Sequence, residues 1–225
     1  MTEYLGPLAQ ESTPSIIADK LRQAIGHGEL KPGTQLGEAE LARKFGVSRG
    51  PLREGMQRLT QEGLLVAIRN RGLFVIEMTA ADIRDMYLAR ETVERAAARK
   101  IIDGDHEAAG SELLRIAEDM AGAATPAEVS EFDIAFHERL VQLARSPRLS
   151  RMHRTFITET RMCIHALDET YAISEVRGEE HRVLANAIRS GDRELTERLL
   201  TAHMDDAIVR LSSEPVADAA EPAGL

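Results

Sequence analysis

The sequence predicts a mostly α-helical chain in two parts. Residues 1–77 contain three helices and a β-hairpin, and residues 78–213 form an antiparallel all-α bundle of about six helices. Three observations support this. Apolar residues recur at helical spacing along most of the chain. The strand-like stretches are two short apolar runs, 64–68 and 72–76. After Met78, helix breaks recur about every 20–25 residues, which is typical of an antiparallel bundle.

The composition is that of a globular protein. The chain has 225 residues, of which 43% are hydrophobic and 29% charged, enough for one large or two small domains. No apolar run is long enough to span a membrane, and the N-terminus lacks the basic start and apolar run of a secretory signal. The single cysteine, Cys163, fits a reducing compartment. We therefore expect a cytoplasmic protein.

The first helices are delimited by turn-forming residues. Residues 1–12 are polar and expected to be loose. The first helix is predicted to begin at Ser15, a candidate N-cap, and to end at Gly28. A short helix follows at 37–45 and ends at Gly46, which is placed as a left-handed C-cap.

The next elements complete a compact motif. A longer helix runs over 48–62 and stops at Gly63. The two short apolar runs then form a hairpin whose turn is 69–71. Helix, short helix, tight turn, longer helix and hairpin is the order of a winged helix-turn-helix, in which the helix after the turn enters the DNA major groove.

The second part is predicted to be helical throughout. Thr79 is a candidate cap for its first helix. The breaks place five further helices, and residues 214–225 form a Pro- and Ala-rich tail that we expect to be disordered. These helices are predicted at about 105–123, 127–144, 147–168, 173–190 and 192–212.

Charge is distributed unevenly along the chain. The net charge of -9 would by itself argue against a nucleic-acid partner. However, residues 1–77 carry a net charge of +1 and residues 78–225 a net charge of -10. Residues 43–71 hold seven basic and two acidic side chains. A basic segment beside an acidic body indicates two domains with different partners, although a solvated helix face is the alternative reading.

The helix after the tight turn carries side chains suited to DNA. Arg49 and Arg53 are four residues apart and share one helix face, from which a guanidinium can bind guanine O6 and N7 or a phosphate. Ser48 and the first backbone N–H groups can hold a phosphate. The residues alone make Ser48, Arg49, Gly50, Pro51, Arg53, Arg69 and Arg71 candidates for DNA binding.

Several spaced motifs of residues 13–77 occur together: Leu30-Lys31-Pro32-Gly33, Phe45-Gly46-Val47-Ser48-Arg49, Pro51-Leu52-Arg53-Glu54, Glu62-Gly63-Leu64 and Arg71-Gly72. With these motifs the segment resembles the DNA-binding domain of GntR-type bacterial transcription regulators. The resemblance implies that Arg49 and Arg53 read bases and that Arg43 and the wing contact the DNA backbone. Gly50 stands where the family often has a DNA-contacting Thr, and Gly55 replaces a usual Ala at a cost of about 1 kcal/mol of helix stability.

Histidines in the second part suggest a metal site. Asp133 and His137 are four residues apart on one predicted helix, so both can bind one ion. His181 and His203 lie on two later helices, and a bundle can bring all four side chains together. This donor set suits Zn²⁺, Ni²⁺, Mn²⁺ or Fe²⁺. The alternative is that each is an ordinary surface or core histidine.

The second part also contains the motifs Arg90-x-x-x-Glu94, Phe132-Asp133-x-x-Phe136-His137, Glu180-His181 and Ala202-His203-Met204. With these motifs, residues 79–212 resemble the FCD effector-binding domain of the FadR-like branch of the same family. It implies that Asp133, His137, His181 and His203 bind a divalent metal, with Zn²⁺ expected in the isolated protein. It also implies a small carboxylate effector.

A carboxylate at such a metal would need a cation for its remaining oxygens. Arg90 and Arg161 are the candidates, because a guanidinium binds a carboxylate with two parallel bonds. Arg90 could instead pair with Glu94 in a surface contact, and Arg161 could be solvated.

Together these features predict a ligand-responsive transcription regulator, most simply a repressor. It would bind a pseudo-palindromic double-stranded DNA operator as a homodimer, because one winged helix covers only a short half-site. The alternative is a helical metalloenzyme with an accessory basic domain. The sequence has no H-E-x-x-H motif and no nucleophile–base pair, so we expect no enzymatic activity.

Overall fold

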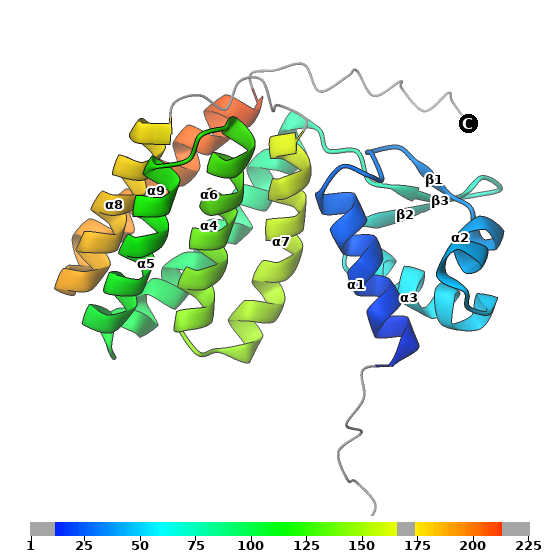
Figure 1. Ribbon diagram of the computed structural model, residues 1–225, viewed down its shortest axis with the longest axis horizontal. Helices are drawn as coiled ribbons and strands as arrows, with labels where there is room; N and C mark the ends of the chain where they lie inside the picture. Colours follow the sequence, from blue (N-terminus) through cyan, green and yellow to red (C-terminus); the bar gives the residue numbers. More distant parts are fainter. Residues whose placement is uncertain (1–11, 166–173, 213–225) are drawn as a thin grey trace, which may run out of the picture. The chain divides into compact units, whose positions relative to one another are not determined.

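The computed structural model describes residues 12–165 and 174–212. They form two compact units that meet in the sequence between Glu77 and Met78. The described residues are mostly helical, with one small antiparallel sheet, which confirms the predicted fold class (Figure 1). The predicted disorder of the two chain ends and the predicted helix break at 168–171 lie outside the described residues.

The first unit has the predicted order of elements, with one addition. The hairpin β2–β3 forms as predicted, and its turn contains Asn70 in a left-handed conformation (φ 61°). A two-residue strand, β1, pairs with the other side of β3 and was too short to show an alternating pattern. The elements are α1 (Thr13–Gly26), β1 (Gln35–Leu36), α2 (Glu38–Phe45), α3 (Arg49–Gln61), β2 (Leu65–Ile68) and β3 (Gly72–Val75).

Helix α1 starts earlier than predicted. Its N-cap is Ser12, whose hydroxyl accepts a hydrogen bond from the backbone N–H of Ser15, so the prediction of Ser15 as the cap was wrong. Pro14 fits inside the first turn because the N–H that it lacks would have no helical partner there. At the other turn, Gly46 has the predicted left-handed conformation (φ 66°).

Helices α1 and α3 approach each other closely at Gly55. A Cβ atom at this position would lie 2.9 Å from Ile17 Cγ2 and 3.0 Å from the carbonyl oxygen of Pro14. The glycine is therefore a packing requirement as well as a loss of helix propensity. Leu52 and Leu59, on the same face of α3, are fully buried.

The second unit is a bundle of six helices within the described residues, as predicted (Figure 1). Thr79 caps the first of them in a capping box with Asp82, and Thr125 does the same for α6 with Glu128. The helices are α4 (Ala80–Ile102), α5 (His106–Ala121), α6 (Pro126–Leu143), α7 (Pro147–His165), α8 (Ser174–Ser190) and α9 (Arg193–Ser212).

Helices α5 and α8 touch along their backbones. A Cβ atom added at Gly110 would lie 2.5 Å from the backbone of Arg189, and one added at Gly178 would lie 2.7 Å from the Cα atom of Ala121. These two glycines set the position of α8, which carries His181.

None of the helices in the described ranges is long and apolar enough to cross a membrane.

Candidate metal centre and nucleic-acid interface

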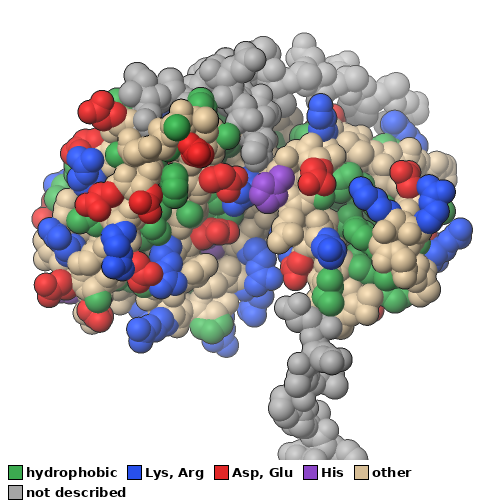
Figure 2. Space-filling view, viewed as in Figure 1, with side chains coloured by type: hydrophobic (Ala, Val, Ile, Leu, Met, Phe, Trp, Pro, Cys, Tyr) green, Lys and Arg blue, Asp and Glu red, His purple; other side chains and the backbone are tan. Residues whose placement is uncertain are grey.

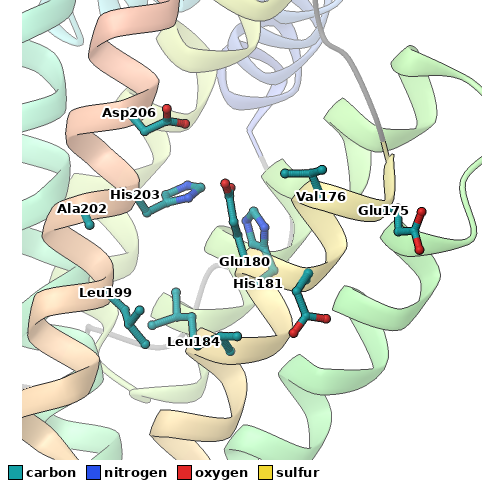
Figure 3. A pocket seen from close by; sticks show the side chains of 11 residues that line it. Glu175, Val176, Glu180, His181, Leu184, Leu199, Ala202, His203 and Asp206 are labelled. Carbon is teal, nitrogen blue, oxygen red and sulfur yellow. The ribbon is translucent and has the colours of Figure 1, made fainter.

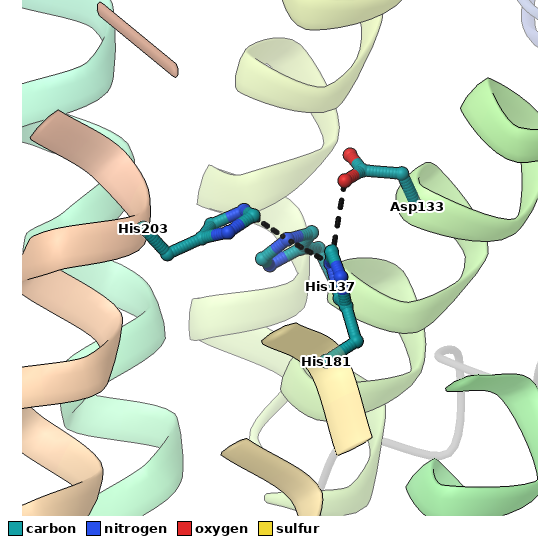
Figure 4. Close-up of side chains that lie close together, drawn as sticks. All are labelled: Asp133, His137, His181 and His203. Carbon is teal, nitrogen blue, oxygen red and sulfur yellow. Dashed lines mark hydrogen bonds and ion pairs between the residues drawn. The ribbon is translucent and has the colours of Figure 1, made fainter. Parts of the chain in front are cut away.

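Four side chains from three helices converge in the second unit (Figure 4). Asp133 and His137 come from α6, His181 from α8 and His203 from α9. One donor atom from each lies within 4.8 Å of the others. Asp133, His137 and His181 are buried, and His203 is half-buried. The structure thus brings together all four residues that the sequence nominated.

The four donor atoms lie close together, but not every one of them has a hydrogen-bond partner. His137 Nε2 lies 3.0 Å from His203 Nε2 and 3.4 Å from His181 Nε2. Asp133 Oδ1 lies 3.3 Å from His181 Nε2, yet it is buried without a hydrogen-bond partner among the described residues. Burial of an unpaired carboxylate oxygen beside three imidazoles is costly unless a cation binds there.

The opposite ring nitrogens fix the tautomers of two histidines. His137 Nδ1 donates to Glu94 Oε2 at 2.6 Å, and His181 Nδ1 donates to the carbonyl oxygen of Arg177 at 2.8 Å. Both Nε2 atoms are thereby left with lone pairs directed into the cluster. Metal-binding histidines usually donate their other ring N–H to a carboxylate or a backbone carbonyl, as these two do. The donor set therefore fits a divalent transition metal.

Electrostatics favour the metal-binding protonation state of three of the four side chains, Asp133, His137 and His203. Burial lowers the pKa of His137, although Glu94 opposes this effect, and burial with the neighbouring histidines holds the pKa of His203 well below its ordinary value. Burial favours a protonated Asp133, but His181 and the other histidines outweigh it and lower the pKa of that carboxyl. A carboxylate and neutral imidazoles are the forms that bind metal.

Glu94 connects the cluster to the bundle core. Besides His137, its carboxylate accepts bonds from Arg90 Nε at 2.7 Å and His153 Nε2 at 2.9 Å. Arg90 and Glu94 are 1% and 0% exposed, so their pair is fully buried and the expectation of a surface contact was wrong. His153 was not singled out in the sequence, although it occupies a buried position on α7.

The two candidate effector-binding arginines differ. Arg90 Nη1 donates to Thr160 Oγ1 at 3.3 Å, while its Nη2 is buried without a partner among the described residues. Arg161 forms an ion pair with Glu131 of α6. Arg90 is therefore a buried guanidinium with an unused donor, whereas Arg161 is already paired with a carboxylate.

A cavity of about 550 Å³ reaches the cluster between α8 and α9 (Figure 3). His181 and His203 belong to its wall, so a small molecule entering it would meet two candidate ligands. Its other lining residues are five apolar and four acidic side chains: Val176, Val183, Leu184, Leu199, Ala202, Glu175, Glu179, Glu180 and Asp206.

The residues nominated for DNA binding lie on the surface of the first unit. Seven of the eight are exposed, and Pro51 is half-buried. The Ser48 hydroxyl makes no capping bond to α3, and the space around Gly50 is open. Among the charged side chains on the face of this unit shown in Figure 2, Lys and Arg are more frequent than Asp and Glu. The helix after the turn thus presents a basic, accessible surface.

One contact at this surface was not foreseen. Arg53 Nε donates to Glu38 Oε2 at 2.7 Å, which links α3 to the first turn of α2. Fifteen residues separate the two, so no local spacing rule connects them.

A winged helix-turn-helix followed by a helical bundle with a buried His/Asp cluster is the architecture of a DNA-binding protein with a second, helical domain. Residues 15–75 match the family described as bacterial regulatory proteins, gntR family, and residues 85–206 match the FCD domain. The chain therefore belongs to the GntR family of transcription regulators with an FCD domain.

Individual relatives are also named as transcription regulators. The chain is 28% identical over 195 residues to the uncharacterized regulator YdhC of Bacillus subtilis, covering 83% of this chain and 85% of YdhC. It is 28% identical over 209 residues to the gluconate operon transcriptional repressor of Bacillus licheniformis, covering 88% and 85%. These relatives are transcription regulators, which supports the expectation that the chain is not an enzyme.

Solved structures show the same architecture. A GntR regulator structure from Rhodococcus sp. RHA1 has a TM-score of 0.74 and 28% identity, covering 89% of this chain and 98% of that one. Escherichia coli McbR/YncC has a TM-score of 0.76 at 21% identity, covering 90% and 98%, and is similar in fold.

Proposed function

We propose that the protein is a ligand-responsive repressor that binds a pseudo-palindromic operator as a homodimer in the cytoplasm. The basic, exposed surface of α3 and the hairpin turn carries the DNA-binding part of this proposal. Two-fold symmetry would place two recognition helices about 34 Å apart on successive major-groove turns. The repressor names of several relatives support the sign of regulation.

In this proposal the second unit holds a divalent metal through Asp133, His137, His181 and His203. The observation that carries it is the buried Asp133 Oδ1, which has no hydrogen-bond partner among the described residues and lies beside three imidazole nitrogens. When bound, the metal would supply a Lewis-acid site for an anionic oxygen. Zn²⁺ is the ion that we expect in the isolated protein.

The proposed effector is a small carboxylate. The unused Nη2 of Arg90 can donate to an oxygen of that ligand, because a buried guanidinium favours an anion. Arg161, engaged with Glu131, is the weaker candidate. The effector would alter DNA binding through its different affinities for DNA-competent and DNA-incompetent dimers.

The DNA part is tested with Arg49→Ala, because this exposed guanidinium makes no hydrogen bond or ion pair within the described residues. Gel-shift titration of a duplex selected by the wild-type protein from a randomised pool should show loss of sequence-specific binding. Metal content should stay unchanged. Lys20→Ala, an exposed change on α1, is the control. Retained specific binding by Arg49→Ala would refute the assignment.

The metal part is tested with His137→Ala. After loading with Zn²⁺ and gel filtration, elemental analysis should show less bound zinc than in wild type, with His27→Ala as the control. A thermal-shift screen of metal-loaded protein against small organic acids then tests the effector class, since a ligand that prefers the folded state raises the midpoint. Wild-type zinc content in His137→Ala would exclude this site.

A further inference from the structure

The candidate recognition helix carries two exposed arginines in different surroundings. The Arg49 side chain makes no hydrogen bond or ion pair within the described residues, whereas the Arg53 side chain is bonded to Glu38. The Arg53 side chain is 63% exposed and that of Glu38 is 34% exposed, so the pair lies at the surface. Glu38 is the first residue of α2, outside the helix that it contacts.

The atoms used by this contact leave the base-reading end of Arg53 available. Glu38 accepts from Nε, the side of the guanidinium nearest the chain. Among the described residues, Nη1 and Nη2 make no hydrogen bond. These two terminal nitrogens are the pair that can meet guanine O6 and N7 together. A carboxylate on Nε therefore restricts the rotation of the side chain without occupying its recognition edge.

We propose that Glu38 is a positioning residue for sequence recognition. It holds the Arg53 guanidinium in one orientation, so that Arg53 loses less side-chain freedom when it binds a base. The inference rests on the proposed base-reading role of Arg53. It assigns to α2, the helix that precedes the recognition helix, a part in discriminating between DNA sequences.

If Glu38 acted on DNA through its charge alone, its removal would have a different effect. A carboxylate near the phosphates repels every duplex, so losing it should tighten binding to any sequence. Loss of a positioning contact should instead weaken discrimination between the preferred sequence and others. The ratio of the two affinities separates the explanations.

Glu40 provides a matched control. It also lies in the first turn of α2, so its charge acts on the same helix dipole. It is exposed and makes no side-chain hydrogen bond within the described part of the chain. Glu40→Gln and Glu38→Gln therefore remove the same charge from the same turn, but only Glu38→Gln also removes the ion pair with Arg53, which leaves at most a weaker, uncharged hydrogen bond.

The experiment compares two probes: the duplex that the full-length wild-type protein enriches from a randomised pool, and a scrambled duplex of equal composition. Glu38→Gln should lower the ratio of specific to non-specific affinity by about 5-fold or more. This is within the loss of affinity that one mismatched base pair causes. Glu40→Gln should tighten binding to both duplexes and leave the ratio unchanged. In an Arg53→Ala background, Glu38→Gln should have no further effect on the ratio.

Two outcomes overturn the inference in distinguishable ways. If Arg53→Ala lowers the ratio but Glu38→Gln leaves it at the wild-type value, the positioning role is wrong and the proposed role of Arg53 stands. If Arg53→Ala itself keeps the wild-type ratio, the base-reading assignment fails and the positioning role fails with it.

Discussion

Glu94 links one residue of the candidate metal centre, His137, to two other buried side chains. Its two carboxylate oxygens accept from His137, His153 and Arg90, and all four side chains are buried. A buried carboxylate is tolerated only when it is paired, and here the pairing also orients His137. The pKa of Glu94 lies well below its ordinary value because His137 and Arg90 outweigh the effect of burial.

Glu94→Gln should weaken zinc binding about 10- to 100-fold, because an amide accepts more weakly from His137 Nδ1 and lowers the basicity of Nε2. The measurement is competition for Zn²⁺ against a chelator of known affinity. Glu118→Gln, an exposed change on α5, should bind zinc as wild type does. Equal zinc affinity in Glu94→Gln would show that the histidine needs no such support.

Glu159 on α7 gives the second unit a pH dependence. Burial, aided by Asp82, raises the pKa of its carboxyl from the ordinary 4.5 to about 7. Between these values the unfolded chain has lost the proton and the folded chain has kept it. Stability should therefore fall as pH rises from about 4.5 to about 7 and then level off.

Glu159→Gln removes this titration. The thermal midpoint of the variant relative to wild type should therefore be higher at pH 8 than at pH 4.5. Comparing the two proteins at each pH cancels the titrations that they share. A difference that does not change with pH would contradict the raised pKa.

At the scale of helices, Gly55 shows two effects acting in opposite directions. Alanine would improve the helix propensity of α3 by about 1 kcal/mol. It would also place a Cβ against Ile17 and the backbone of Pro14. Overpacking a tight contact costs about 1–3 kcal/mol, so the packing term should win.

Gly55→Ala should accordingly destabilise the first unit by up to about 2 kcal/mol net. Native-state hydrogen exchange of α1 and α3 amides measures this locally. Gly50→Ala is the matched control in the same helix, because nothing lies within 4 Å of its added Cβ. It should leave exchange unchanged or slow it. Slower exchange in Gly55→Ala would mean that α1 shifts to accommodate the added Cβ at little cost, and that the gain in helix propensity dominates.

Local sequence patterns were sufficient to predict most elements. Apolar spacing, capping residues and glycines at turns placed the helices and the hairpin, because these signals act within a few residues. They were insufficient for β1, which is held only by its pairing with β3. Arg90 and Glu94 fall on the buried stripe of α4 with Ile83 and Ala97, a signal that could have predicted their burial.

At the scale of the whole chain, the candidate site was predictable only in part. The spacing of Asp133 and His137 pointed to a shared ligand, but their meeting with His181 and His203 depends on how α6, α8 and α9 pack. The convergence of side chains from three helices depends on tertiary packing. It was expected in this chain because of the family resemblance. The contacts of His153 with Glu94 and of Glu38 with Arg53 join distant residues, and no spacing rule predicts them.

The two-unit organisation predicts a local response to metal. All four candidate ligands belong to the second unit. Adding one equivalent of Zn²⁺ should therefore slow amide exchange in α6, α8 and α9, because binding to the native state stabilises it. Residues 13–75 should exchange at an unchanged rate. Equal slowing in both units would show that they unfold together.

The backbone contact between α5 and α8 also bears on the order of folding. Its two partners are separated in the sequence by α6 and α7, so the chain must close a long loop before Gly110 meets Arg189. Contacts between distant segments tend to form late. We expect α8, and with it His181, to be seated after α6 has formed, so the complete ligand set would be assembled only near the end of folding.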